Sequence, residues 1–147
     1  MIIFDINILV YAHREDQVGH RKILQQMETR IRSGEEFAIT PLTAGGFVRV
    51  VTNPRFPNGP TPIDQALSVI DSLARHPSAR WILPGRRHWE IISELCRKCS
   101  AKGKLVADIQ HAAVAIEHAA TWVSCDADFT QLQSLGLRFE HWEHPHE

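Results

Sequence analysis

Three aspartates each follow a short apolar segment, and they are the residues of the chain best suited to chemistry. They are Asp5, Asp108 and Asp126, which come after residues 1–4, 105–107 and 122–125. A carboxylate directly after an apolar strand is costly to desolvate unless it binds a partner. Because hard divalent cations prefer carboxylate oxygens, three aspartates at one edge of a sheet would suit Mg²⁺. The spacing therefore indicates a candidate metal site.

Each of these aspartates also has an ordinary structural explanation. Asp108 and Asp128 precede predicted helices, where aspartate is a favoured N-cap residue. Asp5 could form a buried salt bridge, and Asp126 could lie in a turn. Three carboxylates at one sheet edge repel one another strongly, however, and a bound cation removes that conflict. Taken together, the three positions favour the metal site over three unrelated structural roles.

Short apolar strands alternate with helices along the chain. The predicted strands are residues 1–5, 37–40, 81–83, 121–125 and 137–142. The predicted helices are residues 6–13, 16–32, 41–51, 62–76, 86–100, 109–120 and 129–135. This alternation is typical of a parallel sheet that is covered by helices on both faces. Ligands bind such sheets beyond the carboxyl ends of the strands, where Asp5 and Asp126 fall.

Length and composition favour one globular domain, residues 1–147. The chain is 44% hydrophobic, and its net charge of −1 argues against a general nucleic-acid coat. No apolar run is long enough to span a bilayer, and the first residues lack the pattern of a signal peptide. With three cysteines in no framework spacing, we expect a cytoplasmic protein without a membrane partner.

Five segments carry a resemblance to a known family. They are residues 3–12, 47–54, 84–89, 103–108 and 124–129. In these segments the chain resembles the PIN-domain ribonucleases, and among them the VapC-type toxins of type II toxin–antitoxin pairs. The resemblance implies an α/β domain with a five-stranded parallel sheet of order 3-2-1-4-5, flanked by helices on both faces. It also implies Mg²⁺- or Mn²⁺-dependent endonucleolytic cleavage of RNA, a homodimer and inhibition by a cognate VapB-like antitoxin.

The resemblance assigns roles to the acidic residues. Asp5 and Asp108 match the metal ligands of the family, and Asp126 matches its third acidic residue, so the predicted catalytic set is Asp5, Asp108 and Asp126. In the mechanism that we expect, Asp5 and Asp108 hold the cation while Asp126 positions or deprotonates the attacking water. Asp128 is a common companion of this set. Asn7, two residues after Asp5, is a candidate for orienting the Asp5 carboxylate.

One departure from the family pattern lies in the predicted helix after the second strand. Many members carry a glutamate there, where this chain has Gly46. Glu117 cannot replace it, because it follows Asp108 by nine residues and so lies roughly 13 Å further along a helix. We therefore expect a second metal site to be weak or absent. Two helical glycines, Gly45 and Gly46, cost roughly 1 kcal/mol each relative to alanine, so either the backbone approaches something closely or the helix begins later.

Two rival functions remain open on the sequence. Without an acidic residue at Gly46, the chain could be a PIN domain that binds RNA or an antitoxin with little catalysis. A phosphatase of the haloacid-dehalogenase type would need a second aspartate two residues after Asp5, where this chain has Asn7. His111 lies one turn past Asp108 and is a further candidate for the site. The Cys96-x-x-Cys99 segment has no second cysteine pair and is interpreted as two ordinary cysteines.

Overall fold

The computed structural model describes residues 1–145 and contains a five-stranded parallel sheet. The strands are β1 (Ile2–Phe4), β2 (Phe37–Ile39), β3 (Ala79–Trp81), β4 (Thr121–Ser124) and β5 (Arg138–His141). They lie in the order β3-β2-β1-β4-β5, and every neighbouring pair is parallel. The predicted fold class and strand order are confirmed. The last two residues of the predicted domain, 146 and 147, lie outside the described part of the chain.

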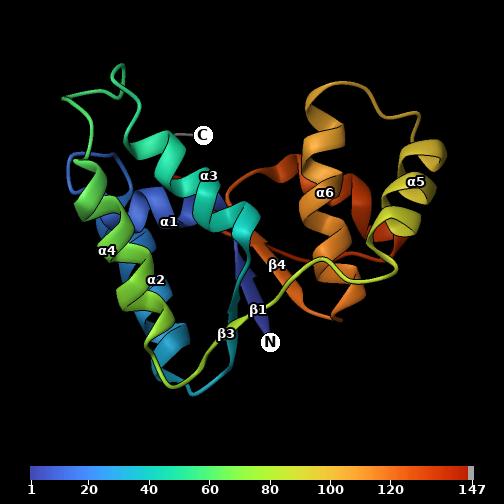
Figure 1. Cartoon of the computed structure of the whole chain (residues 1–147), viewed down its shortest axis with the longest axis horizontal. Helices are drawn as coiled ribbons and strands as arrows, with labels where there is room; N and C mark the ends of the chain where they lie inside the picture. The colour runs from blue at the N-terminus through green and yellow to red at the C-terminus, as the bar shows by residue number, and fades with distance from the viewer. Residues whose placement is uncertain (146–147) are drawn as a thin grey trace.

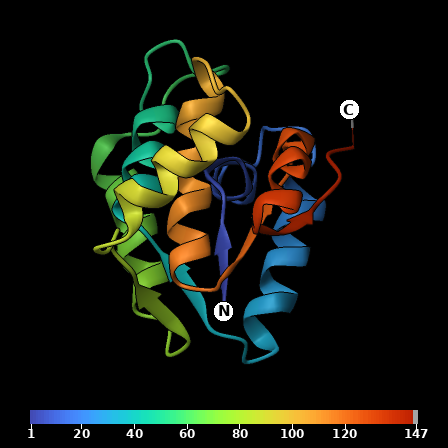
Figure 2. The same cartoon turned by 90° about the vertical axis from the view of Figure 1, so that its right-hand side faces the viewer.

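Helices cover both faces of this sheet. They are α1 (Ile6–His13), α2 (His20–Arg32), α3 (Pro41–Val51), α4 (Ile63–Ala74), α5 (His88–Lys98), α6 (Lys104–Glu117) and the 3-10 helix η1 (Ala127–Leu135). Figure 1 shows α1 to α4 on one side of the strands and α5 and α6 on the other. In Figure 2 the N-terminus lies at the base of β1, drawn in blue. The strand points toward α1, which is seen along its axis. None of the helices within residues 1–145 is long and apolar enough to cross a membrane.

The central strand β1 joins two hydrophobic cores. Ile2 and Phe4 pack against α1 to α4, whereas Ile3 packs against α5, α6 and η1. Successive side chains of a strand point to opposite faces, so a strand that is covered on both sides must be apolar throughout. All three residues are at most 2% exposed. This burial fixes the carboxyl end of β1, and therefore the position of Asp5.

Helix α3 begins where the sequence predicts, and it includes both glycines. Thr40 and Thr43 form a reciprocal capping box at its start, and Pro41 occupies the first turn, where its missing N–H costs nothing. A Cβ atom at Gly46 would lie 2.3 Å from Cδ1 of Ile6. The Ile6 side chain therefore lies against the Gly46 backbone and leaves no room for a Cβ atom there. Because α3 begins at Pro41, a later helix start is excluded.

Helix α6 corrects one part of the sequence interpretation. It begins at Lys104, so the apolar residues 105–107 form its first turn and are not a strand that leads into Asp108. Leu105 and Ile109 both pack into the second core, which is the spacing of a helix face. Gly103, at φ +55°, makes the turn before the helix in a conformation that other residues rarely adopt. Asp108 therefore lies inside α6, and its interpretation as an N-cap is wrong.

The third strand also lies earlier than predicted. Strand β3 covers Ala79–Trp81, whereas the sequence indicated residues 81–83. Ala79 and Trp81 pair with the two ends of β2, so the register with β2 determines where β3 ends. The sequence placed the strand too late because Trp81 and Leu83 are apolar. Both side chains are exposed, so their apolar character does not mark a strand that is buried in a core.

Candidate functional site

Asp5 is held at the carboxyl end of β1 by its neighbour β4. Phe4 lies opposite Val123 in the parallel register, so the residue after β1 meets the last residue of β4. The Asp5 backbone N–H donates to the Val123 carbonyl at 2.8 Å. Its carboxylate accepts from the Ser124 hydroxyl at 2.6 Å and from the Ile6 backbone N–H at 2.6 Å. Asp5 thus caps α1 and is fixed in a single orientation.

The Asp5 carboxyl group is buried, at 8% exposure. Burial, together with the negative charges of Asp108 and Asp126, raises its pKa to about 6. The hydrogen bonds from Ser124 and Ile6 lower this pKa but do not outweigh the burial. Within residues 1–145, no basic side chain forms an ion pair with Asp5. Asp5 is therefore a buried acid whose charged form lacks a cationic partner.

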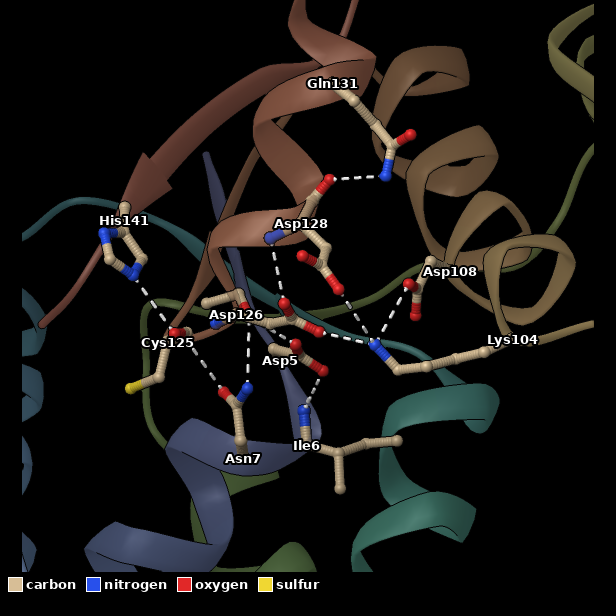
Figure 3. A network of polar contacts seen from close by, with 11 residues as sticks. Asp5, Ile6, Asn7, Lys104, Asp108, Cys125, Asp126, Asp128, Gln131 and His141 are labelled. Carbon is tan, nitrogen blue, oxygen red and sulfur yellow. Dashed lines mark hydrogen bonds and ion pairs between the residues drawn. The ribbon is translucent and has the colours of Figure 1, made fainter. Parts of the chain in front are cut away.

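Lys104 gathers the other three acidic side chains (Figure 3). Its Nζ donates to Oδ2 of Asp126 at 2.8 Å. It also forms ion pairs with Oδ2 of Asp108 at 3.5 Å and Oδ2 of Asp128 at 3.7 Å. These acids come from α6 and from the segment after β4, so one ammonium group joins two elements.

Burial and this ammonium group act in opposite directions on the pKa values of Asp108 and Asp126. Partial burial raises the pKa of Asp108, and Lys104 offsets only part of that effect. Burial also acts on Asp126, but the hydrogen bonds from Lys104 and the Asp128 backbone hold its pKa below the usual range. The hydrogen bond to Asp126 in turn raises the pKa of Lys104. The site therefore already uses a cation to reduce the repulsion among its carboxylates.

The structure brings the three predicted aspartates together at the carboxyl edge of the sheet. Asp5 lies close enough to Asp108 and Asp126 for their charges to act on it. As they stand, no three His, Cys, Asp or Glu side chains within residues 1–145 form a group that could hold a metal ion. The donor set nevertheless fits Mg²⁺ chemically, because it offers carboxylate oxygens, one of them buried without a cation. The predicted liganding roles of Asp5 and Asp108 remain predictions.

Ser124 is the residue that the sequence interpretation missed. It is fully buried, and its hydroxyl donates to Asp5 while accepting from the Asp126 backbone N–H at 2.9 Å. Asn7 donates to the same hydroxyl at 3.1 Å and accepts from the Cys125 backbone N–H. Asn7 therefore orients Asp5 through Ser124 and not by direct contact. The only sequence signal was a serine at the end of an apolar strand.

Two other candidates lie away from the acidic site. His111 stacks against Trp122 with ring centroids 5.1 Å apart, and burial lowers its pKa to about 4. It is therefore a partly buried side chain that packs on β4, where burial disfavours its charged form. Glu117, at the other end of α6 from Asp108, accepts hydrogen bonds from the backbone N–H groups of Gly85 and Arg87. As predicted, it cannot supply the missing acid.

The environment of Gly46 is also informative. The Ile6 side chain, which directly follows Asp5, fills the space that a side chain at position 46 would need. Position 46 therefore borders the acidic site, but the chain places an apolar group there. Cys96 and Cys99 are free, partly buried thiols, and their interpretation as ordinary cysteines remains a prediction. A weak or absent second metal site remains our prediction.

The strand order and the acids at the ends of β1 and β4 define a class of protein. The family model described as "PIN domain" matches residues 2–135. The chain therefore belongs to the PIN-domain family.

Within this family, the chain is similar to proteins named VapC ribonucleases. The chain is 36% identical over 145 residues to Ribonuclease VapC43 of Mycobacterium tuberculosis, covering 99% of this chain and 95% of that protein. It is 30% identical over 135 residues to Ribonuclease VapC25 of the same organism, covering 92% and 95%. VapBC2 of Rickettsia felis, solved bound to a fragment of promoter DNA, has a similar fold. Its TM-score is 0.69 at 21% identity, covering 97% of this chain and 100% of that chain.

Proposed function

We propose that this protein is a Mg²⁺-dependent endoribonuclease that acts as the toxin of a type II toxin–antitoxin pair. The observation that carries the proposal is the buried Asp5 carboxylate, which faces Asp108 and Asp126 at the carboxyl edge of the sheet. The 36% identity to a protein named Ribonuclease VapC43 supports RNA as the substrate.

In this proposal, Asp5 and Asp108 hold Mg²⁺, with Mn²⁺ as an alternative ion. A divalent cation at such a site supplies Lewis-acid activation of water and neutralises charge on the scissile phosphate. Asp126 positions or deprotonates the attacking water. Ser124 and the Ile6 N–H fix the Asp5 carboxylate, as hydrogen bonds to the liganding carboxylates do in many metal sites.

The proposed partners are a cognate VapB-like antitoxin and a second copy of the chain. Support for the antitoxin comes from the similar fold of a VapBC complex. The chain also carries an apolar groove of about 590 Å³ between α1, α2 and α4. Leu24, Met27 and Leu73 line this groove, and a partner helix with an apolar face would suit it.

One other function is favoured by a specific observation. Ile6 occupies the space beside Gly46, and the position that the family resemblance assigns to a glutamate carries no acid in this chain. The alternative is therefore a PIN domain that binds RNA or an antitoxin with little catalysis. Turnover in the presence of metal separates the two functions.

Metal depletion tests the proposal directly. The protein is treated with EDTA, desalted and incubated with total bacterial RNA, and new 5′ ends are mapped by sequencing. We expect no discrete cleavage without metal and discrete cleavage after addition of Mg²⁺, because the carboxylates alone cannot neutralise the phosphate. Equal cleavage in excess EDTA would refute the metal-dependent mechanism. RNA binding without any cleavage at saturating Mg²⁺ would favour the binding function.

A further inference from the structure

We propose that Lys104 has two positions, and this inference rests on the function proposed above. Without metal, its ammonium group lies among the acidic side chains in place of the divalent cation. When the cation binds, Lys104 leaves the acids and contacts an RNA phosphate beside the reaction centre. Lys104 would thus be a substrate-positioning residue that also competes with the metal.

The contacts of Lys104 are those of a substitute cation. Nζ lies 2.8 Å from Asp126, 3.5 Å from Asp108 and 3.7 Å from Asp128. It forms no ion pair with the buried Asp5. One positive charge among four carboxylates leaves the site strongly negative. A divalent cation that also reaches Asp5 would compensate the site better.

Helix stability does not explain why a lysine stands at this position. Lys104 is the first residue of α6, where the helix dipole disfavours a positive charge. Its pair with Asp108 has the basic residue four positions before the acidic one, which is the weaker of the two orders. A residue that conflicts with local helix preferences beside a candidate site is more readily explained by function.

The lysine side chain is also free to move. It is 67% exposed, so its stem is not packed into a core. The carboxylates of Asp108 and Asp126 are only 16% and 27% exposed, so they give up the ammonium group when another cation takes its place. Nζ lies 3.5 Å from the Asp108 carboxylate, so a phosphate on a cation held there would lie near this ammonium group. Lysine binds phosphate as a flexible point charge, which suits such a change of partner.

The first test measures metal affinity without RNA. Lys104→Met and wild-type protein are titrated with Mn²⁺ by calorimetry, and Lys104→Gln serves as a second variant. We expect both variants to bind Mn²⁺ about tenfold more tightly than wild type, because the competing charge is gone. Lys98→Met is the matched control, since Lys98 forms a similar exposed pair with Glu94 at 2.8 Å. It should leave the affinity for Mn²⁺ unchanged.

The second test measures RNA cleavage at saturating Mg²⁺. Lys104→Met is expected to raise KM about tenfold with little change in kcat, and Lys104→Arg should restore most of the affinity for RNA. If wild type and Lys104→Met bind Mn²⁺ with equal affinity, or if KM is unchanged, the inference about Lys104 is overturned. Either result leaves the proposed function standing. If neither protein binds Mn²⁺ and the wild type cleaves RNA in EDTA, the proposed function fails, and this inference fails with it.

Discussion

Asp108→Asn is expected to lower the rate of RNA cleavage about a thousandfold. The amide has almost the same shape as the carboxylate but cannot balance the charge of a divalent cation. Loss of about 4 kcal/mol of transition-state stabilisation corresponds to this factor. Single-turnover cleavage at a fixed Mg²⁺ concentration measures the rate, and calorimetry measures the accompanying loss of affinity for Mg²⁺.

Asp71→Asn is the matched control for this substitution. Asp71 is an exposed aspartate on α4, outside the acidic site. The control should cleave RNA at the wild-type rate. Full activity and unchanged Mg²⁺ binding in Asp108→Asn would remove Asp108 from the proposed set of ligands.

Asp5→Asn is expected to abolish cleavage and yet to stabilise the metal-free protein at pH 8. The pKa of Asp5 is raised to about 6 from a reference value of 3.8, chiefly by burial. Such a shift corresponds to about 3 kcal/mol of unfolding free energy lost when the buried group ionises. Asparagine avoids this cost but weakens the hydrogen bond from Ser124. We therefore expect a net gain of about 1–2 kcal/mol.

The pH dependence distinguishes this explanation from a general effect of the substitution. Between about pH 4 and pH 6, the folded protein keeps the Asp5 proton while the unfolded chain has released it. Stability of the wild type should therefore fall as the pH rises through this window, and the loss should be complete above it. Urea unfolding of metal-free protein at pH 4 and pH 8 measures the difference. An identical pH dependence in wild type and Asp5→Asn would contradict the raised pKa.

The carboxyl ends of β1 and β4 could be predicted because the burial of both sheet faces leaves a clear pattern in the sequence. Residues 1–4 are apolar throughout, residues 122–125 are apolar except for Ser124, and Asp5 and Asp126 mark where that pattern stops. The strand order came from the family resemblance, since apolar runs alone do not say which strands are neighbours. Asp5 and Asp126 were thus placed at the correct edge of the sheet.

The contacts within the site could not be predicted in the same way. Residues 105–107 form an apolar run too short to distinguish a strand from a helix. The sequence prediction therefore placed the start of α6 too late. The contact between Ser124 and Asp5 joins residues 119 positions apart, and it depends on the register of β1 with β4. Lys104 reaches Asp126 only because α6 begins four residues before Asp108.

Crystals grown with Mn²⁺ and measured at its absorption edge would locate the cation by its anomalous signal. Our account predicts one strong peak within coordination distance of carboxylate oxygens of both Asp5 and Asp108, with Lys104 turned away from it. A peak bound elsewhere, or no peak at a Mn²⁺ concentration that supports full RNA cleavage, would contradict the account.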